Sequence, residues 1–334
     1  MPEVKEVLIS IRNMTVSYET RLGAVSAVDG VSFDIFRGEI LGLVGESGCG
    51  KSTLGKGLMR LMPSQGSVHG EIFFGDQDIL KFTDDQMRDF RGRRISMIFQ
   101  DPMTSLNPVQ RIDEHLIEAI QVHEPQTNKM KALDRVKKLI ERMGIQSNRL
   151  SSYPHQLSGG MRQRVMISLG LVLNASLIVA DEATTSLDVI VEAKLVDEIK
   201  KIRNDFGVSI LMITHNIALV ANIADRLAVM YAGRMAEIGP IEQLFANPLH
   251  PYTQGLLACV PSIEIKDNEN LYKMPGEPPN LTHPPSGCRF HPRCPYVMPV
   301  CKELDPKLVE GAPDQFVNCW LYQEQPVVNN PESR

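Results

Sequence analysis

The chain has 334 residues, of which 43% are apolar, and this content is enough to bury a large core and to form more than one domain. Its formal net charge of −5 excludes the basic surface of a dedicated nucleic-acid-binding protein. The first residues, MPEVKEVLISIRN, lack the basic and apolar regions of a signal peptide. The most apolar run, residues 165–180, is shorter than the roughly 20 residues of a membrane span. We therefore expect a soluble, cytosolic protein with no nucleic-acid partner.

Strand and helix signals alternate along the first 240 residues, as is typical of an α/β fold. Glu39–Gly45 is an apolar run bounded by glycines, which indicates a buried parallel strand, and Lys51–Leu61 indicates a helix after it. The run 165–180 predicts a buried helix followed by a strand. Later in the chain, Val191, Leu195, Ile199 and Ile202 recur at helical spacing, strand signals occupy 94–99, 177–180 and 208–213, and 226–231 with 234–238 predict a hairpin.

The distribution of proline marks a domain boundary. Sixteen of the 22 prolines lie in residues 240–334. Residues 101–160 lack strand signals and carry charge patterns typical of helices, which predicts an inserted helical subdomain. We therefore predict one domain over residues 1–245, with a helical subdomain at about 101–165, and a second domain over residues 246–334.

A phosphate-binding loop follows the first buried strand. Residues 45–52, GESGCGKS, satisfy the pattern G-x-x-x-x-G-K-[ST], with a strand before and a helix after, a context that disfavours an ordinary glycine-rich turn. Backbone N–H groups and the helix N-terminus can surround phosphates, Lys51 can reach the β- and γ-phosphates, and the Ser52 hydroxyl can ligate Mg²⁺. Cys49 occupies a variable position of the motif, and we expect it to be a neutral filler rather than a ligand. The predicted nucleotide-binding residues here are Gly45, Glu46, Ser47, Gly48, Cys49, Gly50, Lys51, Ser52 and Thr53.

An acidic pair follows a later strand in LIVADEAT, residues 177–184. The strand delivers Asp181 to the Mg²⁺ side of the phosphates, and Glu182 follows at its tip. Two adjacent carboxylates can divide the work, because one can hold the metal while the other polarises the attacking water. An acidic pair after a strand is often structural, but a phosphate-binding loop in the same chain favours the catalytic interpretation.

A second anion-binding element, LSGGMRQR at residues 157–164, begins 24 residues before Asp181 and opens a helix with Ser-Gly-Gly. With the phosphate-binding loop and the acidic pair, it resembles the signature of the ATP-binding cassette family. The resemblance extends to Tyr18 in VSY, Gln100 in FQDP, the segment Thr185–Asp188 (TSLD) and His215 in ITHN, all in the family's order.

This resemblance implies an α/β P-loop NTPase fold with an antiparallel β subdomain and the inserted helical subdomain. It also implies ATP and Mg²⁺ as cofactors. The chain departs from the family pattern at Met161 in the signature and at Ala183 after Glu182. Neither position supplies an essential charge, so activity should survive both departures. By analogy, Tyr18 stacks on adenine, Gln100 senses Mg²⁺ and the attacking water, His215 contacts the γ-phosphate, Asp188 lies at the dimer seam, and Ser158 and Gly160, with Gly159 between them, bind ATP held by a partner subunit.

The chain carries one phosphate-binding loop and one signature, and in this family the two act across a dimer. A long coiled coil, as in DNA-repair or chromosome-structure ATPases, does not fit between Lys51 and Leu157. Ribosome-associated members normally carry two cassettes in one chain, and an exporter half brings its own membrane spans. These comparisons favour an importer ATPase.

The C-terminal region sharpens the resemblance. NPLHPYTQGLLACVPS (247–262), MPGEPP (274–279) and GCRFHPRCP (287–295) resemble the extension of dipeptide and oligopeptide permease ATPases. The resemblance implies a subunit on the cytoplasmic face of the cell membrane that hydrolyses ATP to power peptide uptake. Its implied partners are two transmembrane permease subunits, a second homologous ATPase and, indirectly, an extracytoplasmic substrate-binding protein. An oligosaccharide or nickel importer, or a soluble ABC ATPase outside transport, are the alternatives.

Four of the six cysteines cluster near the C-terminus: Cys288, Cys294, Cys301 and Cys319 are separated by 5, 6 and 17 residues. Disulfides seldom persist in the cytosol, so clustered thiols indicate metal or redox chemistry. The spacing leaves zinc, an iron–sulfur cluster and free thiols open.

The family resemblance implies a [4Fe–4S] cluster on these four cysteines, in a small, loop-rich metal-binding domain with a structural or redox-sensing role. His291 could replace one ligand, but four cysteines make this unnecessary. Cys259, on a helical stretch, is predicted to be a core residue.

Overall fold

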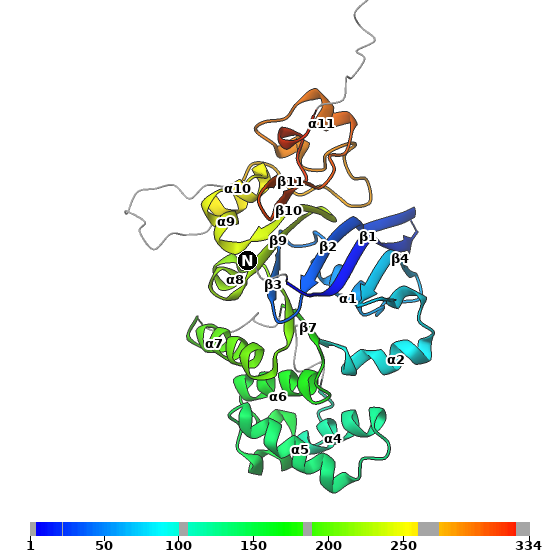
Figure 1. The fold of residues 1–334 in the computed structure, drawn as a ribbon, viewed down its shortest axis with the longest axis vertical. Coiled ribbons are helices and arrows are strands. Elements are labelled where there is room, and N and C mark those ends of the chain that lie inside the picture. Colours follow the sequence, from blue (N-terminus) through cyan, green and yellow to red (C-terminus); the bar gives the residue numbers. More distant parts are fainter. Residues whose placement is uncertain (1–4, 22, 100–105, 183–188, 260–273, 325–334) are drawn as a thin grey trace, which may run out of the picture. The chain divides into compact units, whose positions relative to one another are not determined.

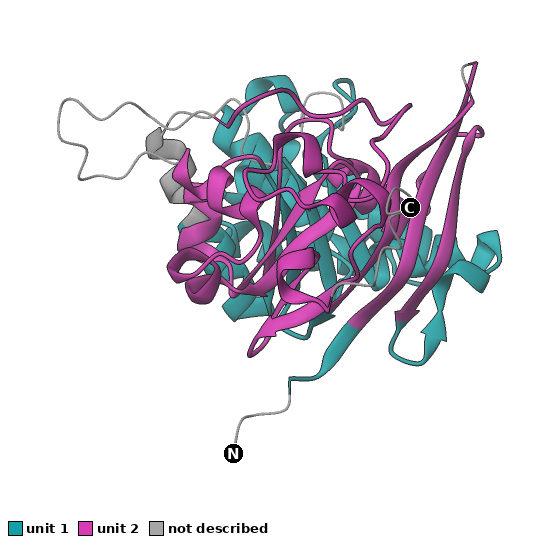
Figure 2. Cartoon of the chain, turned by 90° about the horizontal axis from the view of Figure 1, so that it is seen from above, with its two compact units in different colours: residues 1–8, 35–40, 74–214 teal, residues 9–34, 41–73, 215–334 magenta. Residues whose placement is uncertain are grey.

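The structure, a computed structural model, describes residues 5–21, 23–99, 106–182, 189–259 and 274–324, with the side chains of α7 described from residue 197 onward. Its contacts divide the chain into two compact units, shown in Figure 2. Unit 1 comprises residues 1–8, 35–40 and 74–214, and unit 2 comprises residues 9–34, 41–73 and 215–334. The boundary expected at residue 245 lies inside unit 2, and the two-domain division of the chain stays a prediction.

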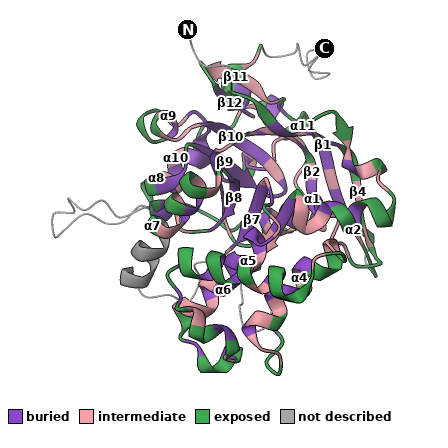
Figure 3. Ribbon diagram, turned by 60° about the horizontal axis from the view of Figure 1, so that its bottom comes forward, coloured by how far each residue is buried: buried purple, intermediate pink, exposed green. Residues whose placement is uncertain are grey.

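Three parallel strands form the sheet of unit 1: β6 (Ile95–Ile98), β7 (Leu177–Asp181) and β8 (Ser209–Ile213). Ile95 of β6 lies opposite Leu177 of β7, which in turn lies opposite Ser209 of β8. Every residue of β7 and β8 is buried, as Figure 3 shows by colour. A strand that is buried on both faces is expected to be a continuous apolar run, which is the pattern that predicted these strands. The strands predicted at 94–99, 177–180 and 208–213 are confirmed as β6, β7 and β8.

Helices account for most of the rest of unit 1. In α5, Ala132, Val136, Leu139 and Ile140 are buried at helical spacing, and the Asn128 side chain caps the helix by accepting from Lys131 N at 2.9 Å. The helix–strand pair expected at 165–180 is confirmed as the end of α6 followed by β7. The helical elements are α2 (Asp84–Arg93), α4 (Ile112–His123), α5 (Lys129–Arg142), α6 (Gly159–Leu171), α7 (Val189–Phe206), η1 (Ile79–Lys81), η2 (Ser147–Ser151) and η3 (Pro154–Gln156), and β5 (Gln77–Asp78) is a short strand.

Unit 2 contains a sheet with the strand order β3-β9-β10-β12-β11. Figure 1 labels β3, β9, β10 and β11 of this sheet. β3 runs parallel to β9, whereas the β9–β10, β10–β12 and β12–β11 pairs are antiparallel. The hairpin predicted at 226–238 is confirmed, and Ala232 and Gly233 make its turn with φ values of 47° and 81°. The strands are β3 (Ile40–Val44), β9 (Arg226–Tyr231), β10 (Arg234–Pro240), β11 (Val309–Ala312) and β12 (Gln315–Val317).

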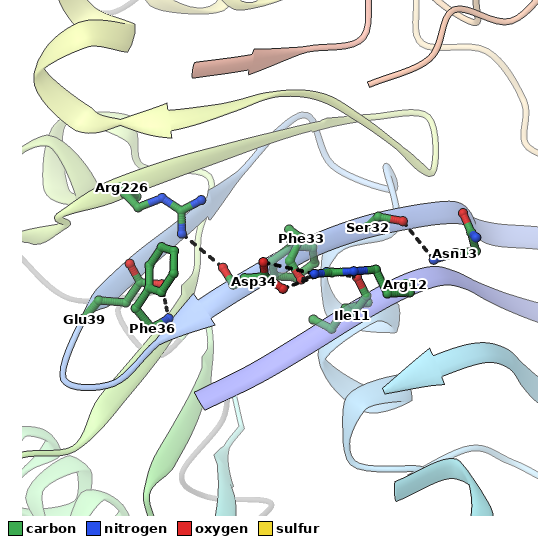
Figure 4. A network of polar contacts seen from close by, with 9 residues as sticks. All are labelled: Ile11, Arg12, Asn13, Ser32, Phe33, Asp34, Phe36, Glu39 and Arg226. Atoms are coloured by element: carbon green, nitrogen blue, oxygen red, sulfur yellow. Dashed lines mark hydrogen bonds and ion pairs between the residues drawn. The ribbon is translucent and has the colours of Figure 1, made fainter. Parts of the chain in front are cut away.

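A second sheet carries β2 (Gly23–Phe36), β1 (Val7–Thr20) and β4 (Gly66–Phe74) in this order. Arg12 on β1 forms a bidentate ion pair with Asp34 on β2, with Nη–Oδ distances of 2.7 and 3.1 Å. Arg226 of β9 donates to the Asp34 carbonyl oxygen at 3.0 Å, so one residue of β2 connects the two sheets of unit 2 (Figure 4).

The C-terminal region extends the sheet of unit 2, because β12 pairs with β10. Glu237 of β10 is fully buried, and its carboxylate accepts hydrogen bonds from Leu249 N and His250 N, both at 2.9 Å, and from Gln315 Nε2 at 2.7 Å. These three donors compensate the burial of a charge. The helical elements of unit 2 are α1 (Lys51–Leu58), α8 (Ile217–Ile223), α9 (Ile241–Ala246), α10 (Pro251–Ala258), α11 (Pro299–Glu303), η4 (His291–Arg293) and η5 (Trp320–Tyr322).

Candidate functional site

The phosphate-binding loop in unit 2 requires glycine at both of its ends. A Cβ atom at Gly45 would lie 2.2 Å from the Met230 carbonyl oxygen, and one at Gly50 would lie 2.1 Å from the Ala27 carbonyl oxygen. Gly50 also has a φ of 101°, which only glycine adopts readily. α1 begins at Lys51, directly after this turn, and the N-terminus of a helix in this position is suited to bind a phosphate.

Lys51 is the cation of this loop. It is 4% exposed, and its Nζ atom donates to the carbonyl oxygens of Gly45 at 2.9 Å and of Glu46 at 3.0 Å. The ammonium group is thus held by the backbone that would surround a phosphate. Cys49 lies beside it, 3.8 Å from Nζ, and burial raises the pKa of its thiol. The Cys49 thiol is therefore neutral at physiological pH.

The acidic pair lies at the carboxyl end of β7 in unit 1. Asp181 is the last residue of this strand and is buried. Glu182 has a φ of 47°, a left-handed conformation that is uncommon for a residue other than glycine, and its N–H donates to the Ile213 carbonyl oxygen at 2.8 Å. Residues held in such conformations cluster at functional sites, which is the context expected for Glu182.

The signature segment opens α6 in unit 1. Ser158 is the N-cap residue, and its hydroxyl accepts from Met161 N at 3.4 Å. Ser158 and Gly159 are exposed, and Gly160 is half-buried. The N-terminus of this 13-residue helix is therefore open to an anion.

The other predicted nucleotide residues are placed separately. Tyr18 lies near the end of β1 in unit 2 and is half-buried, and His215 is exposed in the loop between β8 and α8. The remaining predicted residues lie outside the described part of the chain: Gln100, and the segment 183–188 with Ala183 and Asp188.

Sequence reasoning missed two residues that contact the phosphate-binding loop. The Tyr252 hydroxyl accepts from Glu46 N, and Arg293 forms an ion pair with the Glu46 carboxylate, which raises the pKa of Arg293. Both residues lie more than 200 positions from Glu46 in the sequence, at separations of 206 and 247. No local motif could have identified them.

The four clustered cysteines line one small cavity, together with Phe290 and Trp320. All six cysteines fall within the described residues, and none of them forms a disulfide. Burial is the first cause that raises the pKa of Cys288 to about 12 and that of Cys319 to about 11, and it also raises the pKa of Cys294. These thiols are therefore neutral unless a cation stabilises their thiolates.

The cysteine side chains that line this cavity are suitable metal ligands, but they are not arranged in a metal-binding geometry. Within the described part of the chain, no group of three or more His, Cys, Asp or Glu side chains is arranged to hold a metal ion.

The expected core position of Cys259 is wrong: α10 ends at Ala258, so Cys259 lies at its C-cap and is exposed. His291 Nδ1 lies 2.9 Å from the Cys288 carbonyl oxygen.

Comparison with known proteins agrees with these motifs. Residues 28–185 match the ABC transporter family, and residues 236–301 match the C-terminal region of oligopeptide/dipeptide transporters. The dipeptide transport ATP-binding protein DppD of Bacillus subtilis is 44% identical over 324 residues, which cover 96% of each chain. The chain belongs to the ATP-binding cassette (ABC) transporter ATPases, in their oligopeptide/dipeptide subfamily.

Further relatives of this ABC ATPase extend the comparison. The oligopeptide transport ATP-binding protein OppD of B. subtilis is 40% identical over 331 residues, covering 98% of this chain and 92% of the relative. The solved dimeric structure of MJ0796, a bacterial ABC transporter cassette, is 25% identical with a TM-score of 0.61, covering 70% of this chain and 98% of that chain. These matches confirm the predicted α/β P-loop fold and the enzyme class. Among the described helices, none combines the length and apolarity that crossing a bilayer demands.

Proposed function

We propose that this ABC ATPase hydrolyses ATP to power the uptake of dipeptides or oligopeptides through separate membrane subunits. The observation that carries the proposal is the match to dipeptide and oligopeptide transport ATP-binding proteins over nearly the whole chain, including the C-terminal region specific to them. The phosphate-binding loop, the acidic pair and the open N-terminus of α6 are the parts that the reaction requires.

The proposed reaction assigns a role to each part. The N–H groups of residues 45–53 and Lys51 bind the β- and γ-phosphates, while Glu182 accepts a proton from the water that attacks the γ-phosphorus. The bond from the γ-phosphorus to the bridging oxygen breaks, and ADP leaves with the bonding electrons. Mg²⁺, when bound, neutralises charge on the phosphates. The proposed Mg²⁺-holding residues are Ser52, Gln100 and Asp181; His215 contacts the γ-phosphate, and Tyr18 stacks on adenine.

The proposed active site needs two ATPase chains. Ser158 and Gly160 are proposed to bind ATP held by the opposing subunit, and Asp188 to lie at the seam between the subunits. The open N-terminus of α6 supports this arrangement. We propose a second, homologous ATPase as the partner, beneath two transmembrane permease subunits on the cytoplasmic face of the membrane and served by an extracytoplasmic substrate-binding protein.

Reconstitution tests the transport function and the assembly together. The chain should co-purify with the two permease subunits and a different ATPase, and vesicles containing this complex should accumulate labelled dipeptide only with ATP. The isolated chain should hydrolyse ATP only weakly, because each site lacks its opposing signature. Uptake of an oligosaccharide or nickel instead of peptide would overturn the substrate, and a strict homodimer with the permease subunits would overturn the heteromeric assembly.

We also propose that Cys288, Cys294, Cys301 and Cys319 hold a [4Fe–4S] cluster. Four free thiols around one cavity are a donor set that fits such a cluster. Three aromatic side chains, Phe290, Tyr296 and Trp320, line the same cavity and would limit access of water. The cluster takes no part in the proposed hydrolysis, so its role would be structural or redox-sensing.

Metal analysis tests the cluster. Anaerobically purified protein should be brown and contain about four irons and four sulfides per chain. Cys294→Ser should lower the iron content and destabilise the C-terminal region, while ATP binding by the phosphate-binding loop survives. Cys259→Ser, at the exposed cysteine, is the matched control and should keep the full iron content. Colourless protein with one tightly bound zinc would contradict the cluster.

A further inference from the structure

Glu46, the second residue of the phosphate-binding loop, is held by two side chains from the C-terminal region. The Glu46 N–H donates to the Tyr252 hydroxyl at 3.0 Å. Arg293 donates from Nη1 to Oε2 at 2.8 Å and from Nη2 to Oε1 at 3.0 Å. A bidentate guanidinium–carboxylate pair fixes both distance and orientation. Backbone and side chain of Glu46 are therefore both constrained.

The two anchoring side chains are themselves immobilised. Arg293 is 8% exposed, and it also donates from Nε to the Pro275 carbonyl oxygen at 2.8 Å and from Nη1 to the Tyr231 hydroxyl at 3.3 Å. Tyr252 is fully buried, and its ring centroid lies 4.6 Å from that of Tyr231. Because both side chains are already ordered by packing, holding Glu46 costs them little additional conformational entropy.

Glu46 passes this constraint to the phosphate-binding cation. Its carbonyl oxygen accepts from Lys51 Nζ at 3.0 Å and from Cys49 N at 3.3 Å. A shift of Glu46 would therefore move the carbonyl oxygen that positions the Lys51 ammonium group. Displacement of a phosphate-binding group by about 1 Å is enough to lower function strongly.

A second contact supports the loop from the same direction. Gly233 N donates to the Cys49 carbonyl oxygen at 2.8 Å, and the neighbouring Ala232 carbonyl oxygen accepts from Arg289 Nη1. Arg289 also pairs with Asp29. Arg289 and Arg293 both lie on the short segment that contains Cys288 and Cys294, so this one segment supports the phosphate-binding loop at two points.

We propose that Tyr252 and Arg293 are positioning residues of the nucleotide site, which act through Glu46 to keep the phosphate-binding loop ready for ATP. Neither residue is proposed to contact the nucleotide. This role goes beyond the proposed transport function, because it depends neither on the transported substrate nor on the presence of a cluster. It gives the C-terminal region a direct part in ATP binding.

A double-mutant cycle on ATP affinity tests the proposal. The dissociation constant of a fluorescent ATP analogue with Mg²⁺ is measured on the purified full-length chain for Arg293→Gln, Glu46→Gln and the double variant. Each single variant should bind roughly ten-fold more weakly. The double variant should bind no more weakly than either single one, because both changes remove the same contact. Arg293→Lys should recover part of the affinity, and Tyr252→Phe, which keeps the packing of the ring, should weaken binding as well.

Arg12→Gln is the matched control. It breaks another bidentate ion pair of unit 2, Arg12–Asp34, whose residues are not part of the phosphate-binding loop (Figure 4). This variant should bind the analogue with parental affinity. Parental affinity of Arg293→Gln, or additive losses in the double variant, would overturn the proposal. If Arg293→Gln does not fold, Glu46→Gln decides the question, because parental affinity of that partly exposed variant would overturn it equally.

Discussion

Glu182→Gln should lower ATP hydrolysis by the assembled transporter about 10²–10⁴-fold, while ATP binding survives. Glutamine keeps the size and hydrogen-bonding capacity of the side chain but cannot accept the proton of the attacking water. The backbone at residue 182 should keep its left-handed conformation, since its N–H bond to the Ile213 carbonyl oxygen does not involve the side chain. Hydrolysis is measured as phosphate release, and binding as the dissociation constant for ATP.

Glu242→Gln is the matched control, because it makes the same chemical change at an exposed position of α9. It should leave hydrolysis at the parental rate. Parental hydrolysis by the Glu182→Gln transporter would show that another group accepts the proton.

Lys51→Ala should weaken ATP binding by about a hundred-fold or more. Hydrogen bonds to charged groups contribute about 1.5–3 kcal/mol each, and every 1.4 kcal/mol changes a dissociation constant ten-fold. The lost ammonium group is the cation that the Gly45 and Glu46 carbonyl oxygens hold inside the loop. Equilibrium binding of ATP to the purified chain measures the loss.

Lys56→Ala, on the exposed face of the same helix α1, is the control for this change. It removes an equal charge and an equal side chain outside the phosphate-binding loop, so its affinity should stay near the parental value. Equal losses in the two variants would indicate that net charge, and not the position of Lys51, determines binding.

The elements that sequence could predict are those specified by local patterns. The buried strands 177–181 and 209–213 are apolar runs. The motif GESGCGKS predicts a helix from Lys51, and α1 begins there, directly after Gly50 with its φ of 101°. The predicted helix over 51–61 was too long by one turn, since α1 ends at Leu58 and Arg60 has a φ of 49°.

The elements that sequence could not predict depend on contacts between distant parts of the chain. β11 and β12 have only four and three residues, so their pairing with the rest of the sheet carries no readable periodicity. A glutamate in β10 suggests exposure, but Glu237 is fully buried because three donors from residues 249, 250 and 315 surround it. Arg293 lies next to Cys294 in the sequence, and no local pattern indicates that its side chain binds the phosphate-binding loop.

The pairing of β12 with β10 has a consequence for the order of events during translation. β10 ends at Pro240, but its partner residues Phe316 and Val317 leave the ribosome only after more than 70 further residues have been synthesised. At about 5–20 residues per second, this interval lasts several seconds. During it, the hydrogen-bonding edge of β10 lacks its later partner, and such edges favour pairing with other chains. The nascent subunit is therefore exposed to misassembly through this edge in the interval between the synthesis of β10 and that of β12.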